Sequence, residues 1–268
     1  MKNRLYTYLF ALISGSLILT ACKKEITSVD ESNTALKSTS VQNQTIHNDE
    51  VQSDEVDAEP IPEHNENYTF PQMGNTPEDF IPKGTAFKIQ YQTKGDLNGD
   101  GLEDVVLVLT NISDKDDVRP MLILKQNQDK SYTLDKVSKR AMPDEFLGDG
   151  YKQYYSESIT IENTHLKINL STPNFNGSIN YTYISTEEGL VLMEATRFER
   201  GAGASSHYTL YFLTGEVDHI FTNQMEEPEV DTRTSLTMPV TVHTFEETYV
   251  ESLIDKIYNK YISSHIPD

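Results

Sequence analysis

The composition of the chain changes sharply near residue 67, and only the part after that point can build a hydrophobic core. Residues 25–66 contain eleven acidic residues, one lysine and no aromatic residue. A segment of this composition cannot bury enough apolar surface to offset the entropy of ordering it. We therefore expect residues 22–66 to form a disordered acidic tether; an acidic interaction tail is the alternative.

Aromatic residues return at Tyr68 and Phe70 and stay frequent to the end of the chain. The length of residues 67–268 suits one domain that buries its core without disulfides or metals. The formal net charge of the chain is −20, and much of it lies in the tether. This acidity argues against nucleic acid as a partner.

Hydrophobic periodicity in residues 67–268 predicts mainly β-strands. Phe87, Ile89 and Tyr91 alternate with polar residues, as in a half-buried strand. Residues 105–109 are continuously apolar, which predicts a central strand covered on both faces. Further strands are expected at 121–124, 132–137, 159–161, 166–170, 179–183, 190–192 and 208–212, with the sheet ending at residues 214–215.

The C-terminal segment has a different period. Apolar residues recur every four positions at Phe245, Tyr249, Leu253, Ile257 and Tyr261. Thr244 and Glu247 have the spacing of a capping box, so we expect an amphipathic helix over residues 245–262. The predicted fold class is α+β: a mostly antiparallel sheet or sandwich with one long C-terminal helix.

The N-terminus carries an export pattern. Lys2 and Arg4 precede an apolar run over residues 5–19, which is too short to cross a bilayer core of roughly 30 Å. The run ends in Leu-Thr-Ala-Cys at residues 19–22, which resembles the lipobox of bacterial lipoproteins. The resemblance implies a signal peptide over residues 1–21 and lipid (palmitate) on Cys22. An ordinary signal peptide with a chance cysteine is the alternative.

Cys22 is the only cysteine of the chain. Once it is lipidated no free thiol remains, which excludes thiol catalysis, cysteine-ligated zinc and disulfides. Several acyl chains hold a soluble domain on a membrane stably. Because Lys23 rather than Asp follows the cysteine, the lipoprotein resemblance implies the outer membrane if the host is Gram-negative, with the periplasm as the neighbouring compartment.

One stretch has the pattern of a metal-binding loop. Oxygen-bearing side chains stand at relative positions 1, 3, 5 and 9, with a glycine at position 6, and the residue at position 7 can add its backbone carbonyl. The expected ligands are Asp96, Asn98, Asp100, Leu102 and Asp104. Calcium prefers six to eight oxygen ligands, and alternate positions of a tight loop can converge on one ion. Gly101 permits the sharp turn. The sequence therefore predicts a structural calcium site.

This D-x-N-x-D-G-x-x-D string resembles the calcium loops of dockerins, thrombospondin repeats and FG-GAP repeats. It differs from an EF-hand because Leu107 replaces the bidentate Glu at position 12 and a strand follows. The missing Glu favours weak affinity, suited to millimolar calcium outside the cell. A polar turn that merely connects two strands is the alternative interpretation.

A wider resemblance covers roughly residues 77–215. Residues 79–84, the loop and strand over 95–109, and the Arg-Pro-Met-Leu-Ile-Leu run at 119–124 are similar to segments in a family of uncharacterised bacterial envelope proteins. The resemblance implies a β-rich fold and an envelope location, and it brings no catalytic residue.

Other candidate sites are weaker. Residues 200–206 have the composition of a phosphate loop, but an expected strand replaces the helix that such a loop needs. We interpret them as a strand connection, with ligand contact by Arg197, Arg200 and Ser206 as the alternative. Ser206, His207 and Asp218 match a catalytic triad by residue type, but no nucleophile elbow surrounds the serine. The histidines show no metal-binding spacing.

Two functions remain open from the sequence. The first is a non-catalytic binding module that engages an envelope protein or glycan, with an inhibitor or immunity role as one version. The second is an envelope hydrolase whose catalytic residues form no recognisable motif. The absence of a nucleophile or cofactor motif favours the binding module.

Overall fold

The computed structural model describes residues 68–147, 150–173, 176–201 and 203–265. The predicted signal peptide, Cys22 and the predicted tether lie outside these residues. Within them, no helix has the length and apolar character needed to cross a membrane.

The first half of the described chain forms a five-stranded antiparallel sheet with the order β1-β5-β4-β3-β2. Its elements are β1 (Met73–Gly74), the short 3-10 helix η1 (Pro77–Phe80), β2 (Phe87–Gly95), β3 (Asp104–Asn111), β4 (Met121–Gln126) and β5 (Tyr132–Ser138). β3 lies between β2 and β4, so the prediction of a central strand is confirmed.

The second half forms a seven-stranded antiparallel sheet with the order β12-β11-β10-β9-β8-β7-β6. Its strands are β6 (Ser156–Glu162), β7 (His165–Ser171), β8 (Gly177–Thr186), β9 (Gly189–Arg200), β10 (Ala204–Tyr211), β11 (Glu216–Asn223) and β12 (Val230–Thr237). The expected sheet end at residues 214–215 was wrong, because those residues form the β10–β11 turn. Buried polar residues such as His219 and Thr234 obscure the apolar alternation of the last two strands.

The two sheets share a core, and β3 contributes to the packing on both of its faces. Val106 and Val108 join the main hydrophobic cluster together with residues of β7 and β8. On the opposite face, Leu107 packs in a second cluster that includes Phe80 and Phe87. Burial on both faces explains the continuous apolar run of this strand.

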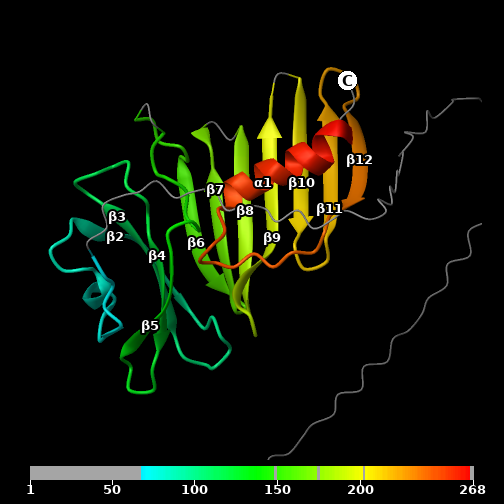
Figure 1. Cartoon of the computed structure of the whole chain (residues 1–268). Coiled ribbons are helices and arrows are strands. Elements are labelled where there is room, and N and C mark those ends of the chain that lie inside the picture. Colours follow the sequence, from blue (N-terminus) through cyan, green and yellow to red (C-terminus); the bar gives the residue numbers. More distant parts are fainter. Residues whose placement is uncertain (1–67, 148–149, 174–175, 202, 266–268) are drawn as a thin grey trace, which may run out of the picture. The chain divides into compact units, whose positions relative to one another are not determined.

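A C-terminal helical segment covers part of the seven-stranded sheet (Figure 1). It consists of α1 (Val250–Ile257), a π-helical turn (Tyr258–Ile262) and a final 3-10 turn (Ser263–His265). Leu253 and Ile254 point from α1 into the main cluster, as the four-residue period predicts. The β-rich prediction is confirmed, while the α+β label fits only loosely because the described chain contains this one long helical segment of 16 residues.

The predicted helix start at residue 245 and its capping box were wrong. α1 begins at Val250, and the cap residue Tyr249 makes no side-chain capping bond. The pairing of β10 with β9 ends at Glu194, so the residues of β9 before Glu194 have no partner in β10. The chain before the helix pairs there instead: the Phe245 amide donates to the Leu190 carbonyl at 2.9 Å. A bridge between Val191 and Thr244 adds to this pairing, and residues 245–247 then form a turn before the helix.

Candidate functional site

The loop between β2 and β3 closes on its own backbone through its carboxylates. Asp96 accepts hydrogen bonds from the amides of Gly99 at 2.7 Å and Gly101 at 2.8 Å. Both glycines have positive φ values, 78° and 82°, a conformation that residues with a Cβ rarely adopt. The two glycines therefore shape the turn that the motif requires.

The next two polar side chains of the loop bond to each other and to the backbone. Asn98 Nδ2 donates to Asp100 Oδ2 at 2.9 Å, and Asn98 Oδ1 accepts from the Asp100 amide at 2.9 Å. Asp100 Oδ1 accepts from the Leu102 amide at 2.8 Å. Each of these oxygens has two lone pairs, so an N–H bond leaves capacity for a cation.

Asp104 forms the buried base of the loop. Its side chain is fully buried, and its carboxylate accepts from the amides of Leu97 and Gln126, both at 3.1 Å. Burial raises the pKa of Asp104, and the nearby carboxylates of Asp100 and Asp96 raise it further, against the lowering effect of the two amide bonds. Three carboxylates therefore lie close enough to repel one another.

The donor set of this loop fits calcium by oxygen type and by charge. A divalent cation would neutralise the repulsion between Asp96, Asp100 and Asp104. Among the described residues, however, no group of His, Cys, Asp and Glu side chains stands in a ready metal-binding arrangement. Ion binding would therefore require the side chains of the loop to rearrange so that more of their oxygens face a common point.

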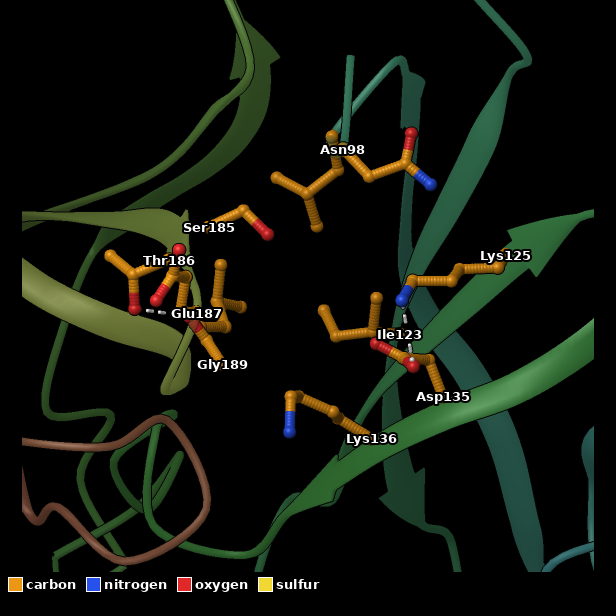
Figure 2. Close-up of a pocket in the computed structure, with 11 residues that line it drawn as sticks. Asn98, Ile123, Lys125, Asp135, Lys136, Ser185, Thr186, Glu187 and Gly189 are labelled. Carbon is orange, nitrogen blue, oxygen red and sulfur yellow. Dashed lines mark hydrogen bonds and ion pairs between the residues drawn. The ribbon is translucent and has the colours of Figure 1, made fainter. Parts of the chain in front are cut away.

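A polar cleft lies beside this loop, between the two sheets. Its volume is about 240 Å³. Leu97 and Asn98 of the loop contribute to one wall, and the β8–β9 turn lies across from them (Figure 2). The lining residues are Leu97, Asn98, Ile123, Lys125, Asp135, Lys136, Ser185, Thr186, Glu187, Gly189 and Leu190. The calcium loop predicted from the sequence is thus part of a recess that the sequence did not predict.

Charged groups of both signs line the cleft. Lys125 Nζ lies 2.9 Å from Asp135 Oδ1, and Lys136 forms an ion pair with Glu246. Gly189 has a φ of 109°, and a Cβ at this position would lie 3.3 Å from Lys136 Nζ. A glycine here keeps the β8–β9 turn close to the lysine. This lining suits a polar ligand whose charged groups can replace one partner of these ion pairs.

The three residues considered as ligand contacts do not meet at one site. Arg197 forms ion pairs with Glu199 and with Asp255 of α1. Arg200 instead donates to Gln224 at 3.2 Å. The two arginines are three positions apart on β9, so they lie on opposite faces of the sheet.

In the structure Ser206 contacts His219, whereas the sequence pattern paired it with His207. Ser206 Oγ lies 2.9 Å from His219 Nε2, and His219 is 1 % exposed. His207 lies on the opposite face, next to Phe198, and Asp218 accepts a hydrogen bond from Ser235 instead.

One sequence signal could have indicated this pair. His219 stands two positions after the apolar Val217, and a strand places residues two apart on the same face. A buried strand face at Val217 therefore implies a buried histidine.

His219 is poorly suited to hold a proton. Burial lowers its pKa to about 4, and the nearby His265 and His207 add to this effect. Within the described residues, no carboxylate hydrogen bonds to its ring. The pair is therefore a serine beside a weakly basic imidazole, without the orienting acid of a triad.

Comparison of the chain with protein-family models, with curated proteins and with solved structures found no match.

Proposed function

We propose that this protein is a lipid-anchored binding module of the bacterial envelope, whose ligand occupies the cleft between the two sheets. The lipobox-like residues 19–22 support export and anchoring through Cys22. The acidic tether would allow the domain to reach a partner away from the membrane surface.

The cleft is the observation that carries this proposal. It combines hydroxyl, amide and charged groups from two sheets, including Asn98, Lys136 and Ser185. Binding sites are commonly recesses with a few polar groups that fix the ligand. Calcium bound by the loop over residues 96–104 would fix the wall that Asn98 contributes, and its role would be structural.

A cleft-filling substitution tests this proposal. Ser185 is an exposed cleft residue at the end of β8, so Ser185→Trp should block the recess without a large cost in stability. Envelope extract is passed over the immobilised full mature chain, and the retained proteins and glycans are identified. Wild type should retain a component that Ser185→Trp loses.

Ser158→Trp is the matched control, because Ser158 is exposed on β6 and lies outside the cleft. The control should retain the same component as wild type. A set of retained components that is identical for all three chains would show that the cleft is not the binding site.

An envelope hydrolase is the second candidate, and the Ser206–His219 pair favours it. In such a reaction Ser206 Oγ would attack the substrate's acyl carbon as its proton passes to His219 Nε2, and the leaving group would depart with that proton. Water would then hydrolyse the acyl-serine and regenerate Ser206. The lowered pKa of His219 makes it a weak base, which places this candidate second. A fluorophosphonate probe should label wild type but not Ser206→Ala; an unlabelled wild type removes the candidate.

A further inference from the structure

The two sheets have four edge strands, and three of them are protected. β1 is only two residues long. β2 and β6 lie against each other, since a Cβ on Gly95 would come within 2.8 Å of Ile161. The fourth edge strand is β12, at the far end of the seven-stranded sheet (Figure 1).

β12 lacks several of the features that normally prevent an edge strand from pairing with another chain. All eight of its residues pair with β11 without a register shift, so it has no bulge. It contains no proline, glycine or lysine. Among the described residues, its strand pairing is with β11 alone. A long, regular edge of this kind is a template for a further strand.

The side chains of β12 restrict which strand can add to it. Asp231, Arg233 and Ser235 are exposed on one face, while Thr234 and Leu236 are buried on the other. A second copy of β12 can pair antiparallel with the first about a two-fold axis perpendicular to the sheet. Side chains alternate between the two faces, so directly opposed residues share a face only if the axis passes through a residue rather than between two residues.

Charge selects one of these pairings. An axis through Arg233 would place Arg233 opposite Arg233, and an axis through Asp231 would place Asp231 opposite Asp231. An axis through Thr232 instead places Asp231 of each copy opposite Arg233 of the other. Opposite charges in directly opposed positions stabilise a strand pair, and like charges destabilise it.

We propose that β12 pairs antiparallel with β12 of a second copy about an axis at Thr232. The side chains of Asp231 and Arg233 are 47 % and 59 % exposed, so both can reach a second copy, while Asp231 Oδ1 also accepts a hydrogen bond from Thr222 Oγ1 at 2.8 Å. The separation between them within one strand is 3.8 Å, which is long for an ion pair. Glu229 would lie opposite Ser235, so no like charges face each other in this pairing.

Cysteine crosslinking in the full-length chain tests the pairing. Thr232→Cys places two thiols opposite each other, with Cβ atoms about 4.5–5.5 Å apart, so oxidation should give a covalent dimer. Ser235→Cys is the control on the same strand: its two copies would lie roughly 20 Å apart and should not crosslink. The wild-type chain, whose only cysteine is Cys22, shows how much crosslinking arises from Cys22 itself.

Charge reversal in the Thr232→Cys background tests the register. Asp231→Arg alone and Arg233→Asp alone should each lower the crosslinked fraction by roughly tenfold, because each turns both ion pairs into like-charge contacts. The double variant Asp231→Arg/Arg233→Asp should restore it. Equal crosslinking at positions 232 and 235, no crosslink at 232, or a double variant as weak as the single variants would overturn the proposal.

Discussion

Arg119 and Glu157 form a bidentate ion pair that joins the two sheets. Arg119 Nη1 lies 2.8 Å from Glu157 Oε2, and Nη2 lies 2.9 Å from Oε1. The two side chains are 1 % and 0 % exposed. Arg119 also donates to the Pro143 carbonyl at 2.6 and 2.8 Å. Arg119 precedes β4 and Glu157 lies in β6, so the pair holds the five-stranded sheet against the edge of the seven-stranded sheet.

Removal of one partner of this pair should destabilise the fold strongly. Glu157→Leu would leave the Arg119 guanidinium buried without its counter-charge, which typically costs about 3–5 kcal/mol of unfolding free energy. The double variant Arg119→Met/Glu157→Leu should recover part of this loss. Urea unfolding measures both values. A single variant that unfolds at the wild-type urea concentration would show that the pair does not hold the sheets together.

The buried His219 should make the protein less stable in mild acid. Its pKa is lowered from 6.5 to about 4 in the folded state, so the unfolded chain binds a proton first as the pH falls. Stability should therefore decrease between pH 6.5 and pH 4, by about 3 kcal/mol from this residue. His219→Gln should remove this part of the pH dependence, as measured by urea unfolding at pH 7 and pH 5.

The exposed His207 on the neighbouring strand provides the control for this measurement. His207→Gln should keep most of the wild-type pH dependence. Burial also lowers the pKa of His243, so a smaller slope should remain in His219→Gln. A His219→Gln variant with the full wild-type slope would contradict the assignment.

The sequence predicted the strands whose side chains alternate or are uniformly apolar. β3 and β8 are examples, because burial in these strands follows apolar character directly. β11 and β12 were missed because His219 and Thr234 occupy inward positions. The helix start was placed too early because Phe245 fits the helical period but is buried from a turn whose backbone bonds to β9. The local sequence pattern cannot show that the backbone of β9 pairs with the segment around Phe245.

The candidate site was predictable only where its residues are close together in the chain. The 96–104 loop is such a case, since its spacing alone suggests an ion. The cleft beside it depends on Lys136 and Ser185, which are distant in sequence and meet only because the two sheets pack together. The Ser206–His219 pair likewise requires knowledge of the β10–β11 register.

Cys22 should be the lipidated first residue of the mature protein. The mass of the intact protein from its host should correspond to residues 22–268 with added acyl chains. Cys22→Ser removes the acceptor thiol and should leave the chain unprocessed or released from the membrane fraction. An unprocessed, unlipidated wild-type chain would contradict the lipobox assignment.

Residues 25–66 should be dispensable for folding, because their composition cannot support a core. Limited proteolysis should cut this segment first and leave a stable fragment that begins near Tyr68. Mass spectrometry of the fragments identifies the cut sites. Protection of this segment, or rapid loss of the fragment after the first cut, would show that the domain boundary is misplaced.

Calcium binding by the 96–104 loop should fix both the start of β3 and the shape of the cleft wall. An ion that binds only the folded state at a hundredfold excess over Kd stabilises it by about 2.7 kcal/mol. For a domain of this size the melting temperature should rise by roughly 5–10 °C. Asp100→Ala should lose this response, and Asp114→Ala, in a different exposed loop, should keep it.

The most direct measurement is the melting temperature of the wild-type chain in millimolar calcium and in chelator. Calcium should raise it by roughly 5–10 °C, because the ion binds the folded state alone. Magnesium should substitute poorly, because it demands a smaller and more rigid octahedral site. Identical melting in calcium and in chelator would show that the loop is only a turn and that no ion fixes the wall of the cleft.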